Sequence, residues 1–156
     1  MTGRLVRDIK QNKPFHSVSL EVFINLARTA DELTRTTAAL LRPHDLTIAQ
    51  YNVLRILIGA GEKGLPCSEI GHRLITHDPD VTRLIDRLEK RSLVVRARDC
   101  ADRRVVTVRI TPTGTTLAEA CDLDRRTTAA LAARFARFSQ DDCQTLITLL
   151  EDLRDP

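Results

Sequence analysis

The chain of 156 residues is poor in aromatic side chains, which make up 3% of it and include no Trp. We therefore expect an aliphatic core, and binding of single-stranded nucleic acid on aromatic stacking platforms is disfavoured. The sequence also lacks an apolar run of the roughly 18 residues that a membrane-spanning helix needs. Its start has no apolar stretch followed by a cleavage site, so we expect no signal peptide, no membrane association and a cytoplasmic location.

Cysteine and histidine are too scattered to form an evident metal site or a disulfide framework. The four cysteines contain no C-x-x-C pair and lie at Cys67, Cys100, Cys121 and Cys143. His72 and His77 are five residues apart, a spacing that does not place two ligands on one helical face. We therefore expect free thiols, no metal and no cofactor.

Positive charge is concentrated in one segment of the chain. The whole chain carries a net charge of +3, whereas residues 83–109 hold nine basic and four acidic side chains, a net charge of +5. Twenty of the 24 basic residues are Arg, the side chain suited to bidentate contacts with phosphates and base edges. A basic segment on a nearly neutral body predicts a nucleic-acid surface.

Periodic apolar residues and capping signals predict several helices. The first is a long helix over residues 17–41, which the sequence RPHD ends. Thr47 and Gln50 then form a capping box for a second helix, which ends near Gly59 and Gly61. A short third helix is predicted in the sequence PCSEIGHRLI.

The helix predicted over residues 78–91 has two different faces. We interpret Asp78 as its N-cap, with Pro79 at the first helical position. Its buried face has apolar residues at helical spacing, namely Val81, Leu84, Ile85 and Leu88. Its outer face carries Thr82, Arg83, Asp86, Arg87 and Lys90. This charged face is suited to DNA; an ordinary solvated face is the alternative interpretation.

A β-hairpin is predicted after this helix, with strands over residues 93–98 and 105–110. In the second strand Val106, Val108 and Ile110 alternate with Val105, Thr107 and Arg109. Three helices followed by a two-stranded ribbon predict a winged helix-turn-helix in a mostly α fold with a small β-hairpin wing. The preceding helix would enter a major groove, while the charged hairpin tip lies over the adjacent backbone and minor groove.

The C-terminal part of the chain is predicted to form two more helices. Thr111 is expected to cap a helix that begins at Pro112 and runs to about Phe138, and Ser139 to cap the last helix. The apolar side chains expected inside the last helix are Leu146, Ile147, Leu149, Leu150 and Leu153.

The predicted elements suggest a single domain with helices at both ends that serve dimerisation. The expected ranges are a domain at 17–153, a DNA-binding lobe at 45–111, dimerisation helices at 17–42 and 112–153, and a mobile N-terminal arm at 1–16. The apolar stripes of the terminal helices exceed what a small lobe can cover, so we expect a homodimer.

The sequences LTIAQYNVLRIL and DVTRLIDRLEKRSLVVRARDCADRRVVTVRITPTG closely resemble the MarR family of bacterial transcriptional regulators. The resemblance covers about Leu20 to Leu153. It implies a homodimer with a winged-helix lobe on each subunit, which binds a palindromic operator in double-stranded DNA. Such regulators are usually repressors that a small ligand or oxidation releases.

The resemblance also places residues at the DNA. The recognition helix contributes Pro79, Asp80, Thr82, Arg83 and Arg87, the wing contributes Asp102, Arg103 and Arg104, and the strand arginines Arg96 and Arg98 complete the predicted set. In the family's wing, the Arg matching Arg104 enters the minor groove and the Asp matching Asp102 holds it in place. The sequence departs from the family at Ser92, where Gly is common, and a positive φ there would cost some tenths to about one kcal/mol. Asp78 and Asp80 replace small hydroxyl residues, which predicts an unusual operator.

The resemblance also implies positions for an effector site. The family's ligand site lies between the dimerisation helices and the lobe, and the matching positions are Phe23, Ala27, His44, Tyr51, Arg55 and Leu117. His44 and Arg55 suit an anionic aromatic ligand; a structural His and a surface Arg are the alternative. Cys100 lies beside Arg98 and Arg103, whose charges favour a thiolate, so it is a candidate redox switch. An incidental exposed thiol is the alternative.

The alternatives to DNA binding are a protein-interaction module and an enzyme. A winged helix can serve as a protein-interaction module without operator binding, although the +5 segment disfavours this role. Enzyme activity is not expected, because the sequence contains no nucleotide-binding loop, no H-E-x-x-H and no G-x-S-x-G motif.

Overall fold

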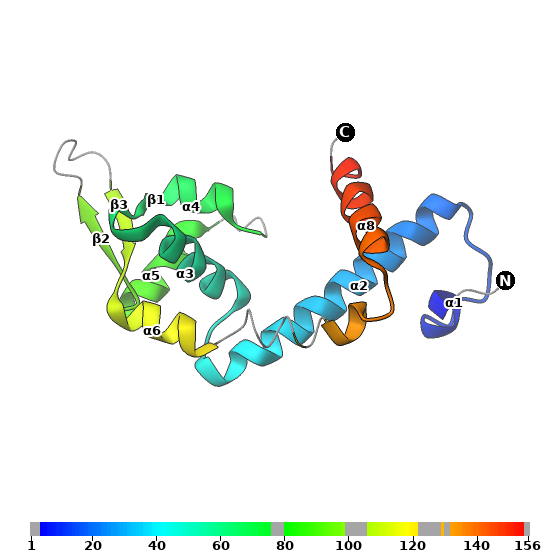
Figure 1. The fold of residues 1–156 in the computed structure, drawn as a ribbon, viewed down its shortest axis with the longest axis horizontal. Coiled ribbons are helices and arrows are strands. Elements are labelled where there is room, and N and C mark those ends of the chain that lie inside the picture. The colour runs from blue at the N-terminus through cyan, green and yellow to red at the C-terminus, as the bar shows by residue number, and fades with distance from the viewer. Residues whose placement is uncertain (1–3, 76–79, 99–105, 122–128, 130–131, 155–156) are drawn as a thin grey trace. The chain divides into compact units, whose positions relative to one another are not determined.

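The computed structural model describes residues 4–75, 80–98, 106–121, 129 and 132–154 (Figure 1). It divides into two compact units, Met1–Ala39 and Leu40–Pro156. Within the described ranges, no helix combines the length and the apolar character needed to cross a membrane. The fold is mostly helical with one small antiparallel sheet, which confirms the predicted fold class.

The first unit consists of helical segments. The short helix α1 (Arg4–Asp8) lies within the predicted N-terminal arm and buries Leu5. The long helix α2 (Val18–Leu41) matches the predicted helix and extends from this unit into the second. Several apolar side chains of α2 are exposed in this chain, namely Val18, Leu20, Val22, Phe23 and Leu26. The mobility of the arm stays a prediction.

The second unit begins with helices around an aliphatic core. These are the 3-10 turn η1 (Arg42–His44), α3 (Ile48–Ala60), the 3-10 turn η2 (Gly61–Lys63), α4 (Cys67–Arg73) and α5 (Val81–Lys90). Their core includes Leu41, Leu46, Val53, Leu54, Leu57, Ile70, Ile85 and Leu88. Its aromatic member is Tyr51, which is 7% exposed and the only Tyr of the chain.

Local signals fix the position of α3. Thr47 Oγ1 accepts a hydrogen bond from Gln50 N (3.2 Å), and Gln50 Oε1 accepts one from Thr47 N (2.9 Å). These two bonds form the predicted capping box. The helix ends at Gly61, whose φ of 67° lies in the region that favours glycine. The sequence therefore predicted both ends of α3 closely.

Three short strands form the sheet at the wing (Figure 1). They are β1 (Leu65–Pro66), β2 (Val94–Arg98) and β3 (Val106–Ile110), in the spatial order β1-β3-β2. β2 and β3 pair as the predicted hairpin, with Val94 opposite Ile110 and Arg98 opposite Val106. The sequence did not predict β1, because two residues are too few to show an alternating pattern.

The burial of β3 differs from the simple alternation expected from its sequence. Val108 is fully buried, but Val106 is 38% exposed because it lies at the end of the strand away from the core. Thr107 is buried, and its hydroxyl donates a hydrogen bond to Ala97 O (3.2 Å). The central residues of the strand are thus covered on both faces.

The C-terminal end of α5 has the hydrogen bonds of a Schellman motif. Leu93 N donates to Leu88 O (3.0 Å), and Ser92 N donates to Glu89 O (2.8 Å). Ser92 has a φ of 56°, so the residue that stands where Gly is common in the family does adopt a positive φ. This motif turns the chain sharply from α5 into β2.

A second cap connects the sheet to helix α6 (Pro112–Cys121). Thr111 Oγ1 accepts a hydrogen bond from Gly114 N (3.0 Å) and donates to Ser92 O (2.7 Å). A Cβ at Gly114 would lie 2.1 Å from Leu93 O, so this close approach requires glycine. The predicted continuation of this helix toward Phe138 falls partly outside the described residues.

The last helix, α8 (Gln140–Asp152), begins with the predicted Ser139 cap. Ser139 N and Oγ both donate to Asp142 Oδ2, at 2.9 and 2.8 Å. These bonds hold the pKa of the Asp142 carboxyl below its usual value. The prediction that the apolar side chains of this helix lie inside is wrong for the single chain, because Leu146, Ile147, Leu149 and Leu153 are 44–63% exposed.

Candidate nucleic-acid interface

Helix α5 separates its side chains into a buried and an exposed face. Leu84, Ile85 and Leu88 are at most 6% exposed and belong to the core. The exposed side chains, here called the outer face of α5, are Thr82, Arg83, Arg87 and Lys90. Three cations and a hydroxyl group on one short helix provide the contacts that phosphates and base edges accept.

The start of α5 corrects the interpretation of its N-cap. The cap is Asp80 rather than Asp78, and its Oδ1 accepts a hydrogen bond from Arg83 N (3.0 Å). Its Oδ2 lies 3.0 Å from Arg83 Nε, so the same carboxylate also pairs with the first cation of the outer face. Two Asp residues precede the apolar repeat, and the repeat alone does not decide which of them caps the helix.

Arg96, a member of the predicted DNA-binding set, contacts α5. Its guanidinium lies 2.6 Å from Glu89 Oε2 and 2.6 Å from Asp86 Oδ1. A third guanidinium contact reaches Thr82 O (3.3 Å), and the backbone N of Arg96 donates to Glu89 Oε1 (2.9 Å). Burial lowers the pKa of Arg96, but the hydrogen bonds to the two carboxylates outweigh burial and raise it.

Arg91 forms a second long-range contact that the sequence pattern did not indicate. Its guanidinium donates to Asp45 O (2.5 Å) and to His44 O (3.3 Å), carbonyls that precede it by 46 and 47 residues. Asp45 has a φ of 52°, a left-handed conformation that forms the corner between η1 and α3. Arg91 therefore ties the C-terminal end of α5 to this corner.

Part of the predicted DNA-binding set lies outside the described residues. This group comprises Pro79, Asp102, Arg103 and Arg104, together with the candidate redox residue Cys100. For Arg98 the structure describes the backbone, which belongs to β2. The contacts expected of these residues stay predictions.

The positions predicted for an effector site fall in both units. Phe23 and Ala27 are exposed residues of α2 in the first unit. In the second unit, Tyr51 is buried in the core and Leu117 packs against it. The remaining two are Arg55, whose side chain is exposed, and His44, which is half-buried and accepts the bond from Arg91 through its backbone oxygen.

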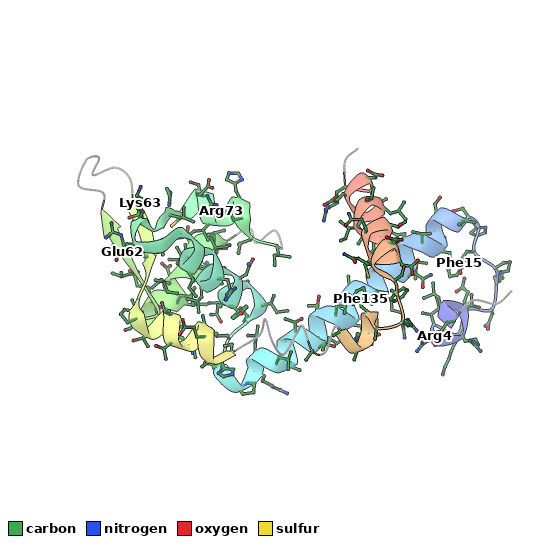
Figure 2. The ribbon with its side chains drawn as sticks, viewed as in Figure 1. Arg4, Phe15, Glu62, Lys63, Arg73 and Phe135 are labelled. Atoms are coloured by element: carbon green, nitrogen blue, oxygen red, sulfur yellow. The ribbon has the colours of Figure 1, made fainter. Side chains whose placement is uncertain are left out.

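The second unit contains a surface pocket of about 530 Å³ at other positions. Its lining residues are Leu57, Ile58, Gly61, Glu62, Arg109, Ile110 and Thr115, none of which belongs to the predicted effector set. Glu62, labelled in Figure 2, lies on η2, next to the strand β3 that carries Arg109. The pocket thus has an apolar floor and one side chain of each charge.

Metal-binding groups and thiols give no further candidate site in the described part of the chain. There, no three His, Cys, Asp or Glu side chains gather in a way that could hold a metal ion. Cys67 and Cys143 are free thiols, and Cys121 is buried in the core. The ion pair between Arg73, labelled in Figure 2, and Glu69 joins neighbouring turns of α4 and is exposed.

A trio of helices, a small antiparallel sheet and a basic outer face on the third helix define a winged helix-turn-helix DNA-binding protein. The family model described as "Transcriptional regulator SarA/Rot" matches residues 35–121, more than half of the chain. Solved MarR-type regulators share the fold. The chain therefore belongs to the MarR family of winged-helix transcriptional regulators, with the SarA/Rot group as its matching model.

Two curated relatives are transcriptional regulators. The HTH-type transcriptional regulator TtmR of Methylorubrum extorquens (strain PA1) is 35% identical over 78% of this chain and 59% of its own length. The HTH-type transcriptional regulator MhqR of Bacillus subtilis (strain 168) is 29% identical over 62% of this chain and 65% of its own length. The chain thus spans less than two thirds of the length of either relative.

Solved structures resemble the chain over most of its length. A MarR transcription factor from Planctomyces limnophilus is 33% identical, with a TM-score of 0.64 over 88% of this chain and 98% of its own. BpsR of Bordetella bronchiseptica, whose DNA binding is regulated by 6-hydroxynicotinic acid, is 25% identical. Its TM-score is 0.76 over 92% of this chain and 99% of its own.

Proposed function

We propose that the protein is a repressor that binds a palindromic operator in double-stranded DNA as a homodimer, in the cytoplasm. In this proposal residues 45–111 form the DNA-binding lobe of a single domain at 17–153. The segments 17–42 and 112–153 form the dimer. A small ligand or an oxidant releases the protein from its operator.

The outer face of α5 is the observation that carries the proposal. Its cations lie on the side of the helix opposite the core, so the helix can enter a major groove without unfolding the lobe. Arg87 lies one turn after Arg83 and extends the same face. The winged helix-turn-helix fold of the family supports this docking geometry.

The proposed dimer is supported by apolar side chains that a single chain leaves exposed. They lie on α2, on residues 135–138, on α8 and at its C-cap, and include Val18, Phe23, Phe138, Leu149 and Leu153. Exposed apolar faces of this extent mark interaction surfaces. A two-fold dimer would match the two halves of a palindromic site.

Release by a small organic ligand is supported by BpsR, a protein of the same fold whose DNA binding responds to 6-hydroxynicotinic acid. In our protein the proposed ligand site involves Phe23, Ala27, His44, Tyr51, Arg55 and Leu117. Release by oxidation would act through Cys100.

The test of the proposal is to select double-stranded DNA from a random pool and to measure binding over a range of salt concentrations. The selected duplex and a scrambled duplex of equal length are compared by fluorescence anisotropy. We expect tight, salt-dependent binding to the selected duplex and weaker binding to the scrambled one.

A pair of variants assigns the binding to α5. Arg87→Ala is expected to weaken binding to both duplexes and to lower the salt slope by about one charge. Arg35→Ala is the matched control, because Arg35 pairs with Asp31 on α2, outside the lobe, and it should leave the slope unchanged. Absence of duplex binding by the wild type would favour a protein-interaction module instead.

A further inference from the structure

Arg96 belongs to a network that joins the wing strand β2 to helix α5. Its guanidinium contacts Asp86, Glu89 and the backbone oxygen of Thr82, three positions at i, i+4 and i+7 on one side of the helix. The Arg96 side chain is 25% exposed, so its charged group is largely enclosed by these partners. We call this set the Arg96 clamp.

The Arg96 clamp lies directly beside the outer face of α5. Each clamp position precedes an outer-face cation by one residue: Thr82 precedes Arg83, Asp86 precedes Arg87, and Glu89 precedes Lys90. One residue corresponds to about 100° of rotation around a helix axis. Contacts that hold the clamp side of α5 against β2 therefore also fix where the outer face points relative to the wing.

The electrostatics of the clamp are unsuited to a phosphate contact. One guanidinium faces two carboxylates, so the three side chains together carry a net negative charge. A DNA phosphate approaching Arg96 would be repelled by the side chains of Asp86 and Glu89, which are 46% and 36% exposed. A guanidinium shared between two carboxylates and a backbone oxygen makes the contacts of a structural tie.

We propose that Arg96 is a positioning residue for operator recognition, which orients α5 against the wing through Asp86 and Glu89 and touches no DNA itself. The proposal rests on the proposed function, since it assumes that α5 and the wing dock on one duplex. In this proposal the carboxylates of Asp86 and Glu89 contribute to DNA binding because they hold the recognition helix in position.

The experiment measures binding of the selected and the scrambled duplex over a range of salt concentrations for five variants. The single variants are Arg96→Gln, Arg96→Lys and Glu89→Gln, and the double variants are Asp86→Asn/Glu89→Gln and Arg96→Gln/Glu89→Gln. We expect Arg96→Gln to lower affinity for the selected duplex on the order of tenfold, with little change on the scrambled duplex and no change in salt slope. Arg87→Gln is the matched comparison, because it should weaken both duplexes and lower the slope.

The carboxylate variants give the sharpest contrast. Removing a negative charge near DNA should strengthen binding to both duplexes if only long-range electrostatics matter. If the clamp orients α5, the carboxylate variants should instead bind the selected duplex more weakly. The losses of affinity from Arg96→Gln and Glu89→Gln should also not be additive. Glu89→Gln and Arg96→Lys keep part of the hydrogen bonding, so they carry the test if Arg96→Gln does not fold.

Four results would overturn the proposal or its premise. A salt slope lowered by about one charge in Arg96→Gln would make Arg96 a phosphate contact. Unchanged affinity for the selected duplex in a folded Arg96 variant, or stronger binding by Glu89→Gln, would show that the clamp does not orient α5. A wild-type protein that binds neither duplex would instead overturn the proposed function.

Discussion

Ser92 lies in a turn whose backbone conformation its side chain disfavours. Its φ of 56° and the two Schellman hydrogen bonds at the end of α5 are usually provided by glycine. A β-carbon in this conformation is in steric conflict with the backbone. The turn nevertheless forms, because it places Leu93 in the core and because Thr111 Oγ1 donates a hydrogen bond to Ser92 O.

Replacing Ser92 with Gly is therefore expected to stabilise the protein. The free energy of unfolding should rise by about 0.5–1 kcal/mol, because glycine adopts a positive φ without strain. Urea denaturation followed by circular dichroism measures the change. Ser68→Gly is the control: Ser68 lies within α4, where glycine should be destabilising. A Ser92→Gly variant less stable than wild type would contradict this account.

Asp80 has two roles that different substitutions separate. Asp80→Ala removes the N-cap of α5 and should cost about 1 kcal/mol of stability, whereas Asp80→Asn keeps an acceptor for Arg83 N and should cost little. Both substitutions release the Arg83 side chain from its ion pair. Chemical denaturation tests the first effect. Binding to a scrambled duplex, which should become tighter in Asp80→Asn, tests the second.

At the scale of elements, the sequence predicted what neighbouring residues determine. The Thr47 and Ser139 capping boxes, the apolar side of α5 and the β2–β3 hairpin all follow from spacings of a few residues. It did not predict β1, whose two residues depend on pairing with β3. The contacts of Arg96 and Arg91 were also missed, because a basic residue in a basic segment gives no sign of its distant partners.

The helix α8 is expected to depend on the charge of Asp142. Because the pKa of this carboxyl is lowered in the folded state, its contribution to stability is present above the ordinary pKa of an aspartate. It is lost as the pH falls through the lowered value. Far-ultraviolet circular dichroism at decreasing pH should show a loss of helix that Asp142→Asn makes less dependent on pH. Asp141→Asn, at the neighbouring position, should behave as wild type.

The predicted wing is tested by two residues that lie between β2 and β3 in the sequence. Arg104→Ala should lower affinity for selected and scrambled DNA alike and reduce the salt slope by about one charge. Asp102→Ala should give a milder loss, because Arg104 would remain but be held less well. A salt titration of both variants measures this. Unchanged binding and slope in Arg104→Ala would mean that the hairpin is not a DNA-contacting wing.

At the scale of the whole molecule, the exposed apolar helices imply association. We expect a stable homodimer, with recognition helices about 34–36 Å apart to match one turn of duplex. Leu149→Asp/Leu153→Asp, on α8 and at its C-cap, should produce monomers in sedimentation velocity, because charges would then lie in the proposed interface. Ile75→Asp is the control, since Ile75 is 82% exposed but lies in the lobe. A wild-type monomer at micromolar concentration would disprove the dimer.

The buried position of Tyr51 gives the protein an intrinsic spectroscopic label. The chain has no Trp and no other Tyr, so its tyrosine fluorescence comes from one ring in the core of the DNA-binding lobe. The helices α2 and α8 contribute to the far-ultraviolet signal but carry no fluorophore of this kind. Denaturation followed by both signals therefore distinguishes unfolding of the lobe from unfolding of the remaining helices, without any engineered probe.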